Sequence, residues 1–561
     1  MITHKSPISG IASFNNTYVA TAGYDNTIIL WDAKSGKSIG RGCHDHLVNQ
    51  CTFNSDGKLL ISSGSDYIAR VWEIPSMQLK CILNGHSDDV EGLSFHSSKD
   101  WVATCSRDKT IRIYDLDGNV LKVLKGHTDD IISVEWIKGS DILVSSADDG
   151  TVKYWDVISG KIIKDLSFND VETDTIAITL DGTIFAGNDE GEIVIIKNDE
   201  EPIMKLAHKA GIKRLVYSDE VNKLISLSYD RSFKVWNYTN GTVTLESSHE
   251  FNNMVWPRSC SFLNKDEIVF GAFGNKYAQF NLKTERWLDN KIKPTHGINA
   301  ICEVGRDVYY VGDSGFVYKN NVKISEMGSL CNFIIDFKGV IITGGQTGEV
   351  FDAVTGEVYY QHNSPLNCAT NFKHNGQSAL MVGTYTGKGI TLLLTNDNKV
   401  EFLKLVSIHD NAIKGISASN EFIYTVCATG AAAYHNLDTF ECEYHIEHGH
   451  SKIANDCVSY GVNKFASISR DLKLRLWDKE ECQTIDTSHR NSLKCISSDA
   501  SGRYLAIGDY VGFVSVYDIE KKDFVTHNRL SDFGISSISF SSAKNKFLAS
   551  SYNGKFYEVG V

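Results

Sequence analysis

Two stretches of the sequence decide the fold: GHSDDVEGLSF…VATCSRDKTIRIYD at 85–115 and GHTDDIISVEW…LVSSADDGTVKYWD at 126–156. They align with a period of about 40 residues, which is typical of repeat architectures. Four further copies with the same pattern lie at 4–31, 43–73, 207–237 and 449–478. A fixed period overrides local assignments of helix or strand, so this repeat must be explained first.

The same residue types recur at fixed spacing within the copies. His127 lies 22 residues before Asp149, with Ser145 four residues before that Asp and Trp155 six residues after it. The other sets are His4, Thr21, Asp25 and Trp31; His44, Ser62, Asp66 and Trp72; His86, Thr104, Asp108 and Tyr114; His208, Ser226, Asp230 and Trp236; and His450, Ser467, Asp471 and Trp477. Between these positions apolar residues alternate at period 2, as in TIIL, TIRIY and TVKYW. This alternation predicts short antiparallel strands, about four per repeat.

These residues resemble the WD40-repeat family, which has a Gly-His near the start of each repeat, a Trp-Asp near its end and an Asp between them. The resemblance is strong over 1–240 and at 449–478, and it implies a β-propeller with one four-stranded sheet per blade around a central channel. Weaker copies bring the total to about fourteen WD repeats, too many for one closed ring. We therefore expect an all-β chain of two tandem seven-bladed β-propellers, an N-terminal one at 1–290 and a divergent C-terminal one at 291–561.

The closure of the second ring has two solutions. The final copy stops after its third strand, and only Met1–Thr3 precede His4. Either this short N-terminal segment adds a strand to the second ring, or the last blade stays three-stranded.

Charge and cysteine content indicate the class of partner and the compartment. Residues 1–290 hold 30 Lys and Arg against 40 Asp and Glu, and residues 291–561 hold 26 against 29. An acidic first half disfavours nucleic acid and anionic lipid and favours a basic protein partner. Thirteen Cys without a C-x-x-C pair indicate reduced thiols. With no apolar run of membrane-spanning length and no signal-peptide core, we expect a cytoplasmic protein without membrane contact, as a monomer or a subunit of a larger complex.

Catalytic and metal-binding interpretations find little support in the motifs. Six copies of one His-Ser-Asp set make no sense as active sites, and the resemblance implies that each set forms a buried hydrogen-bonded chain within its blade. Cys442, His445, His448 and His450 could suggest zinc, but their spacing is unlike that of common structural sites and His450 already belongs to a repeat. Turns such as those in WDAKSGKSI and FDAVTGEVYY resemble those of quinone-cofactor propeller dehydrogenases, although tight hairpins explain them more simply. We predict no enzymatic activity, no cofactor and no metal.

The exposed rim offers the candidate binding site. In the family, the positions three and five after the blade His, and the one before the blade Asp, face one rim of the propeller. One sector of this rim is acidic, with Tyr residues at its edges, and the candidate partner-binding residues are Tyr24, Asp88, Asp89, Glu91, Arg107, Asp129, Asp130, Asp148 and Tyr229. This sector is either a solvated acidic rim or a docking patch for a segment bearing Lys or Arg.

The leading hypothesis is a protein–protein interaction scaffold that presents two propeller surfaces. A tandem propeller that binds RNA is the first alternative, for which HNRLSDF and HRNSLK are the nearest basic segments. No concentrated basic groove with interleaved aromatic residues supports it. A cofactor-dependent propeller enzyme is the second alternative.

Overall fold

The computed structural model describes residues 2–168, 171–197, 200–239, 241–288, 292–395, 397 and 399–560. These residues form strands, turns and bends, with no helix among them. Accordingly, no helix in these ranges has the length and apolar character that crossing a membrane requires. The strands form thirteen four-stranded sheets and one three-stranded sheet, all antiparallel between neighbours in the chain.

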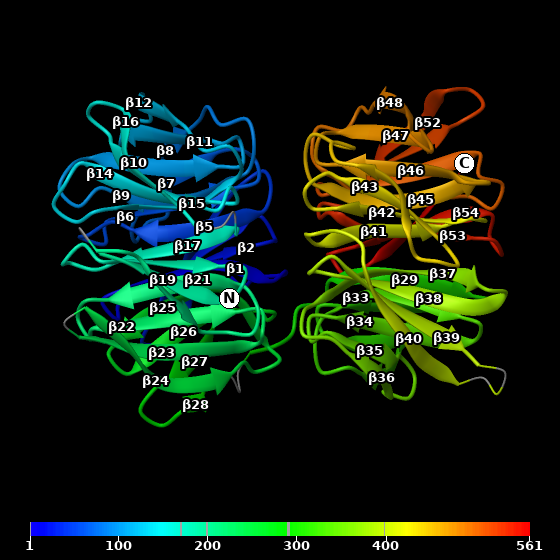
Figure 1. Cartoon of the computed structure of the whole chain (residues 1–561), viewed down its shortest axis with the longest axis horizontal. Coiled ribbons are helices and arrows are strands. Elements are labelled where there is room, and N and C mark those ends of the chain that lie inside the picture. The colour runs from blue at the N-terminus through cyan, green and yellow to red at the C-terminus, as the bar shows by residue number, and fades with distance from the viewer. Residues whose placement is uncertain are drawn as a thin grey trace. The chain divides into compact units, whose positions relative to one another are not determined.

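The chain divides into two compact units, Met1–Thr295 and His296–Val561. Each unit holds seven of the sheets and is a seven-bladed β-propeller, as the repeat predicted. In Figure 1 the first propeller runs from blue to green and the second from green to red.

The strands of the first propeller follow one another four to a blade. They are β1 (Ile8–Phe14), β2 (Tyr18–Gly23), β3 (Thr27–Asp32), β4 (Ser38–Cys43); β5 (Val48–Phe53), β6 (Leu59–Gly64), β7 (Ala69–Glu73), β8 (Gln78–Leu83); β9 (Val90–Phe95), β10 (Trp101–Ser106), β11 (Thr110–Asp115), β12 (Val120–Lys125); β13 (Ile131–Trp136), β14 (Ile142–Ala147), β15 (Thr151–Asp156), β16 (Lys161–Ser167); β17 (Thr173–Ile178), β18 (Ile184–Asn188), β19 (Glu192–Ile196), β20 (Ile203–Leu206); β21 (Ile212–Ser218), β22 (Lys223–Ser228), β23 (Ser232–Thr239), β24 (Thr242–Glu250); β25 (Val255–Asn264), β26 (Glu267–Ala272), β27 (Ala278–Asn281) and β28 (Arg286–Trp287).

The second propeller repeats the arrangement with a shorter last blade. Its strands are β29 (Ile298–Val304), β30 (Asp307–Gly312), β31 (Phe316–Lys319), β32 (Val322–Glu326); β33 (Cys331–Phe337), β34 (Val340–Gly345), β35 (Glu349–Asp352), β36 (Val358–Gln361); β37 (Leu366–His374), β38 (Gln377–Thr384), β39 (Lys388–Leu394), β40 (Val400–Ser407); β41 (Ile413–Ala418), β42 (Phe422–Cys427), β43 (Ala432–Asn436), β44 (Cys442–Ile446); β45 (Ala454–Gly461), β46 (Lys464–Ser469), β47 (Lys473–Asp478), β48 (Glu481–Asp486); β49 (Leu493–Ser498), β50 (Tyr504–Asp509), β51 (Phe513–Asp518), β52 (Asp523–Arg529); β53 (Ile535–Ser541), β54 (Lys546–Ser551) and β55 (Phe556–Val559).

The hydrophobic core lies between neighbouring blades. Ala103 and Ile111 of one blade pack with Trp136 and Trp155 of the next. The middle strands are buried on both faces, whereas the fourth strand of a blade exposes most of its residues. Each sheet therefore needs a neighbouring sheet on both of its faces, and a closed ring of blades provides this.

Both rings close through contacts between their first and last blades. In the first propeller β25 lies against β1, where Ile11 N donates to Ser259 Oγ at 3.1 Å. In the second, β53 lies against β29, and β53–β55 form a three-stranded sheet among the residues described. Of the two solutions for closing the second ring, the structure has the three-stranded blade. The N-terminal segment bonds within the first propeller instead, through His4 N and Asn275 O at 3.0 Å.

The recurring His, Ser or Thr, Asp and Trp residues form the expected chain within their blades. His127 Nε2 and Ser145 Oγ lie 2.7 Å apart, Trp155 Nε1 donates to the same Oγ at 2.8 Å, and His127 Nδ1 lies 2.8 Å from Asp149 Oδ2. Burial would raise the pKa of Asp149, but hydrogen bonds from His127 and Thr151 hold it below its usual value. Equivalent bonds join the sets that begin at His4, His44, His208 and His450. In the set that begins at His86 the aromatic residue is Tyr114, whose Oη donates to Asn84 O at 3.1 Å.

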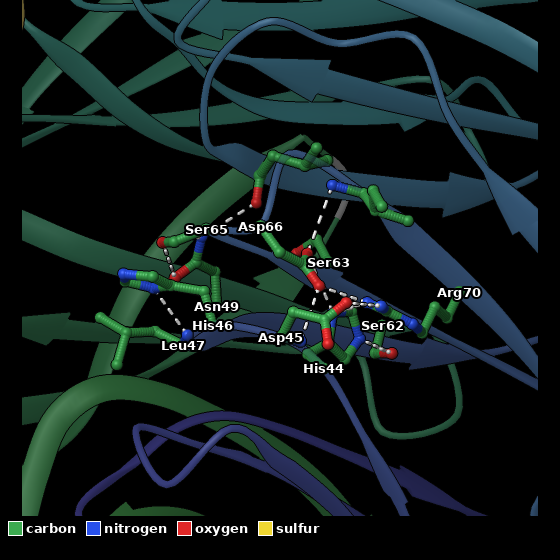
Figure 2. A network of polar contacts seen from close by, with 12 residues as sticks. His44, Asp45, His46, Leu47, Asn49, Ser62, Ser63, Ser65, Asp66 and Arg70 are labelled. Carbon is green, nitrogen blue, oxygen red and sulfur yellow. Dashed lines mark hydrogen bonds and ion pairs between the residues drawn. The ribbon is translucent and has the colours of Figure 1, made fainter. Parts of the chain in front are cut away.

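In two of these sets an arginine that the repeat pattern did not reveal lies against the His. Figure 2 shows His44 between Ser62 and Asp66, with Arg70 beside them. Arg70 Nη1 lies 2.6 Å from His44 Nδ1 and also donates to Asp66, while Nη2 reaches Asp45 Oδ2 at 3.0 Å. Burial lowers the pKa of His44, and the charge of Arg70 adds to this effect while Asp66 opposes it. The pKa of His450 is lowered in the same way by burial and by the charge of Arg475, which lies beside it.

Candidate functional site

A bulge at the start of each blade sets one side chain apart from the regular strand pairing. In every sheet the pairing of the first two strands is irregular near the start of the first strand, and in most the second residue of that strand is skipped. Such bulges re-aim side chains and recur beside functional sites. We call the end of a propeller where first strands begin and second strands end its mouth. The bulge residues at the first mouth include Ser9, Asn49, Ile132, Asp174 and Lys213.

Arg107 joins two blades at the first mouth. It follows β10, donating from Nε to Glu91 Oε1 at 2.7 Å and from Nη1 to Asp130 Oδ2 at 2.6 Å. Burial alone would lower the pKa of Arg107, but the charges of Glu91 and Asp130 raise it well above its usual value. The arginine is a permanent cation that neutralises only part of the acidic sector.

Lys213 joins the next acidic residues. Its ammonium bonds Asp174 and lies 3.1 Å from Asp189 Oδ1. It also lies 4.6 Å from the centre of the Tyr229 ring, a cation–π contact. At the first mouth Arg107 and Lys213 are thus each bonded to a carboxylate of a neighbouring blade.

Asp148 lies between these two clusters and has the least favourable environment. Burial raises its pKa well above the usual value, and the negative charges of Asp174 and Glu172 raise it further while Arg107 opposes them. Its Oδ1 is buried and accepts no hydrogen bond from the residues described. A buried carboxylate oxygen without a donor favours an incoming cation.

The structure brings the predicted acidic residues to one mouth but exposes them unequally. Asp129 is the most open, with 56% of its side chain exposed, and lies 3.4 Å from Lys109 Nζ. Asp88 is half-buried, and its Oδ1 accepts the Asp89 N–H at 2.8 Å. Asp89 is 1% exposed, so it faces the interior rather than a partner.

The two tyrosines of the predicted site already have partners. The Tyr24 ring packs against Trp256 at 5.1 Å, and its hydroxyl accepts from Arg258 Nη1 at 3.1 Å. Tyr229 lies under Lys213. Both rings are half-buried walls of the mouth.

Sequence reasoning missed Glu172, Asp174 and Asp189. Their blade, β17–β20, lacks the His and Trp by which the other copies were aligned. The period alone could have found them, because Asp174 follows the bulge residue Ile132 by 42 residues. These carboxylates extend the acidic surface beyond the predicted sector.

The second mouth is built mainly from asparagines. Asn332, Asn367 and Asn455 are bulge residues whose Nδ2 atoms donate to the carbonyl of the first strand residue in the next blade, at 2.7, 2.7 and 2.6 Å. Asn49 makes the same bond to Val90 O in the first propeller, at 3.0 Å. These side chains link neighbouring blades. The same register position holds Lys414 and Lys494 in two other blades.

The zinc alternative gains nothing from the geometry. His450 is 2% exposed and bonded to Ser467 and Asp471. Cys442 Sγ contacts Tyr444 O at 3.5 Å. Within the described ranges, no three His, Cys, Asp or Glu side chains are grouped as metal ligands.

Comparisons with known proteins agree with this architecture. The family description "WD domain, G-beta repeat" matches residues 1–32, 36–73, 77–115 and 118–156. The protein LST8 homolog of Dictyostelium discoideum is 30% identical over 240 residues, covering 39% of this chain and 76% of that protein. The chain belongs to the WD40-repeat family. The target of rapamycin complex subunit wat1 of Schizosaccharomyces pombe is 26% identical, over 41% of this chain and 78% of that protein.

Solved structures of WD40 proteins resemble part of the chain. The crystal structure of the RRP9 WD40 repeats has a TM-score of 0.44 and 19% sequence identity, covering 48% of this chain and 88% of that one.

Proposed function

We propose that this WD40-repeat chain is a non-enzymatic scaffold for protein partners, and that the mouth of its first propeller docks a segment bearing Lys or Arg. A general role in protein interaction is supported by family membership and by the S. pombe relative, whose name describes a complex subunit. The thirteen cysteines are all free thiols, which supports a reducing, cytoplasmic setting.

The observation that carries the docking proposal is the half-buried Asp148 at the edge of the mouth, whose Oδ1 is buried and accepts no hydrogen bond from the residues described. Its acidic neighbours Asp174 and Glu172 disfavour its charged form, and Arg107 only partly offsets them, so a cation brought to this place would favour the charged form. A guanidinium or ammonium group would stabilise that charge directly. The exposed Asp129 and half-buried Asp88 extend the attraction outward and speed encounter.

The His and Ser or Thr side chains of the repeated sets support the non-enzymatic part of the proposal. They are buried and bonded to one another, as in His127, Ser145 and Trp155. A hydroxyl in this position stabilises its blade and does not face a substrate.

The test is equilibrium binding of a short synthetic peptide rich in Lys and Arg to the full chain. The variant carries Asp88→Asn, Asp129→Asn and Asp148→Asn, because an amide oxygen can still accept the backbone bonds that Asp88 and Asp129 now accept. We expect affinity to fall about fivefold or more, since each exposed charge contributes roughly 0.2–1 kcal/mol.

The matched control carries Asp115→Asn, Asp117→Asn and Asp156→Asn, which make the same charge change at the ends of β11 and β15 opposite the mouth. It should bind like the parent. Equal losses in both variants would show attraction to net charge alone, and an unchanged affinity in the mouth variant would remove the docking site from this surface.

A further inference from the structure

The second mouth contains a lysine whose charge the protein does not balance by an ion pair. Lys494 is the bulge residue of β49, the position that Lys213 occupies in β21. Both lie beside the tyrosine that follows the next strand: Lys213 Nζ is 4.6 Å from the Tyr229 ring centre, and Lys494 Nζ is 6.0 Å from that of Tyr510. Lys213 is paired with two carboxylates, whereas Lys494 Nζ has no hydrogen bond or ion pair with the residues described.

This lysine lines a cavity that runs from the second mouth into the channel. The cavity has a volume of about 210 Å³, and its wall includes Lys414, Lys494, Tyr552 and Asp456. Lys414 lies over the Tyr385 ring at 4.6 Å. Asp456 is the carboxylate of this wall, and both of its oxygens accept backbone N–H groups, from Cys457 at 2.8 Å and Ile496 at 3.0 Å. The wall thus holds two ammonium groups and one carboxylate, and for Lys494 the described residues provide no ion pair.

Bulge residues of three other blades offer hydrogen-bond acceptors to the same cavity, and one of them, Asn455, lies between the blades of Lys414 and Lys494. Asn332, Asn367 and Asn455 use their amide nitrogens to bond the neighbouring blade. Their Oδ1 atoms accept no hydrogen bond from the described part of the chain, and all three residues line the cavity. A ligand that fits this wall brings hydroxyl donors to the asparagines and negative charge to the lysines.

We propose that the second mouth binds a small phosphorylated polyol, with the phosphate at Lys494 and Lys414 and the hydroxyls at the asparagine carbonyls. A phosphate monoester carries about −1.5 to −2 charge at pH 7. This charge matches two ammonium groups better than the single negative charge of a carboxylate ligand would. Lysine binds phosphate as a point charge, and Tyr552 of the wall carries a hydroxyl that can donate. A cavity of about 210 Å³ has room for a small molecule rather than a peptide segment.

The test is calorimetric titration of the full chain with glucose 6-phosphate as probe, alongside inorganic phosphate, glucose and a phosphoserine peptide. We expect one glucose 6-phosphate per chain, at least fivefold tighter than inorganic phosphate, with no heat from glucose. Lys494→Gln should weaken binding tenfold or more. Lys546→Gln, the same charge change where β54 begins at the opposite end of the same propeller, should not.

Circular dichroism and the unfolding midpoint show whether each variant keeps its fold. Absence of glucose 6-phosphate binding, or equal binding by Lys494→Gln in the folded state, would overturn the proposal. Equal affinity for phosphate and glucose 6-phosphate would overturn the polyol assignment, and binding of the phosphoserine peptide alone would assign the cavity to a protein partner. None of these outcomes bears on basic-peptide docking at the first propeller.

Discussion

Single residues at the two mouths differ in charge although the backbone places them alike. The bulge in the first strand puts Asp174 and Lys213 at the first mouth, and Asn455 and Lys494 at the second. At the first mouth the lysine is bonded by acids, so the surplus charge is negative. At the second mouth the neighbouring blade supplies the Asn455 amide instead of a carboxylate, and the described residues give Lys494 no ion pair. The same bulge in the first strand thus occurs at both mouths, although the charges of the bulge residues differ.

Docking of a basic segment should depend on pH through Asp148. Because burial, Asp174 and Glu172 raise its pKa well above the usual value, this carboxylate takes up a proton in a higher pH range than an ordinary aspartate does, and Arg107 only partly opposes this. Affinity for a Lys/Arg-rich peptide should therefore fall as pH decreases through that range. Titrations at several pH values should show the fall in the parent and a flatter profile in Asp148→Asn. Parallel profiles would mean that Asp148 does not contact the basic group.

Glu135 provides a test of stability in the channel of the first propeller. Burial raises its pKa to about 7, although Lys138 and Arg214 act in the opposite direction. The unfolded value is about 4.3, so between about pH 4 and 7 the folded chain binds more protons than the unfolded chain, and stability falls as pH rises through this window. Glu135→Gln should remove this loss and be more stable than the parent by about 2–3 kcal/mol at pH 8.

Urea unfolding at pH 4, 6 and 8 measures the effect of Glu135→Gln. The two proteins should have the same stability at the lowest pH and diverge as pH rises. A variant that is no more stable than the parent at pH 8 would show that the Glu135 carboxylate is well solvated.

Each blade is an element that the repeat encodes almost completely. The period of two fixes which residues lie on each face of a strand. The hydrogen-bonded side chains of Trp, Ser, His and Asp tie the third strand to the second strand, to the segment before the first strand and to the turn between the second and third strands. Burial of these polar groups is tolerated because they satisfy one another. This explains why the strongest copies in the sequence have the most regular hydrogen bonds, and why a blade such as β17–β20 can lose them while apolar packing maintains it.

Substitutions in the blade β13–β16 separate packing from polar bonding. Trp155 is 1% exposed, so Trp155→Ala should cost about 3–5 kcal/mol through the cavity it leaves. Asp149→Ala should cost about 1–3 kcal/mol by removing the partner of a buried donor. Because the pKa of Asp149 is lowered in the fold, its contribution is present above the unfolded value and is lost as pH falls. Denaturant unfolding against the half-buried Asp156→Ala measures both effects, and parental stability in both would assign these residues to a binding site.

At the scale of the whole molecule, the period predicted two rings of seven blades but not the details of their mouths. Family spacing located Glu91 and Lys213 as mouth positions, since both lie five residues after a blade His. It could not show that Asp89 turns inward or that Arg107 bonds Glu91 and Asp130, because side-chain partners depend on the neighbouring blade and not on the repeat itself. The asparagine links of the second mouth were missed because that half of the sequence has diverged from the pattern. Blade count is a property of the period, whereas the charge of a mouth is a property of a few bulge residues.

The measurement that tests the central proposal most directly is the association rate of a Lys/Arg-rich peptide with the full chain at about 0.05 M and about 0.5 M salt. If the acidic first mouth is the docking site, the parent should associate several-fold faster at low salt, and this advantage should shrink at high salt because exposed charges are screened beyond about 8–10 Å near physiological ionic strength. The folded Asp88→Asn, Asp129→Asn, Asp148→Asn variant should lose most of the low-salt advantage, and the Asp115→Asn, Asp117→Asn, Asp156→Asn control should keep it. Equal rates for parent and mouth variant at low salt would contradict the proposal.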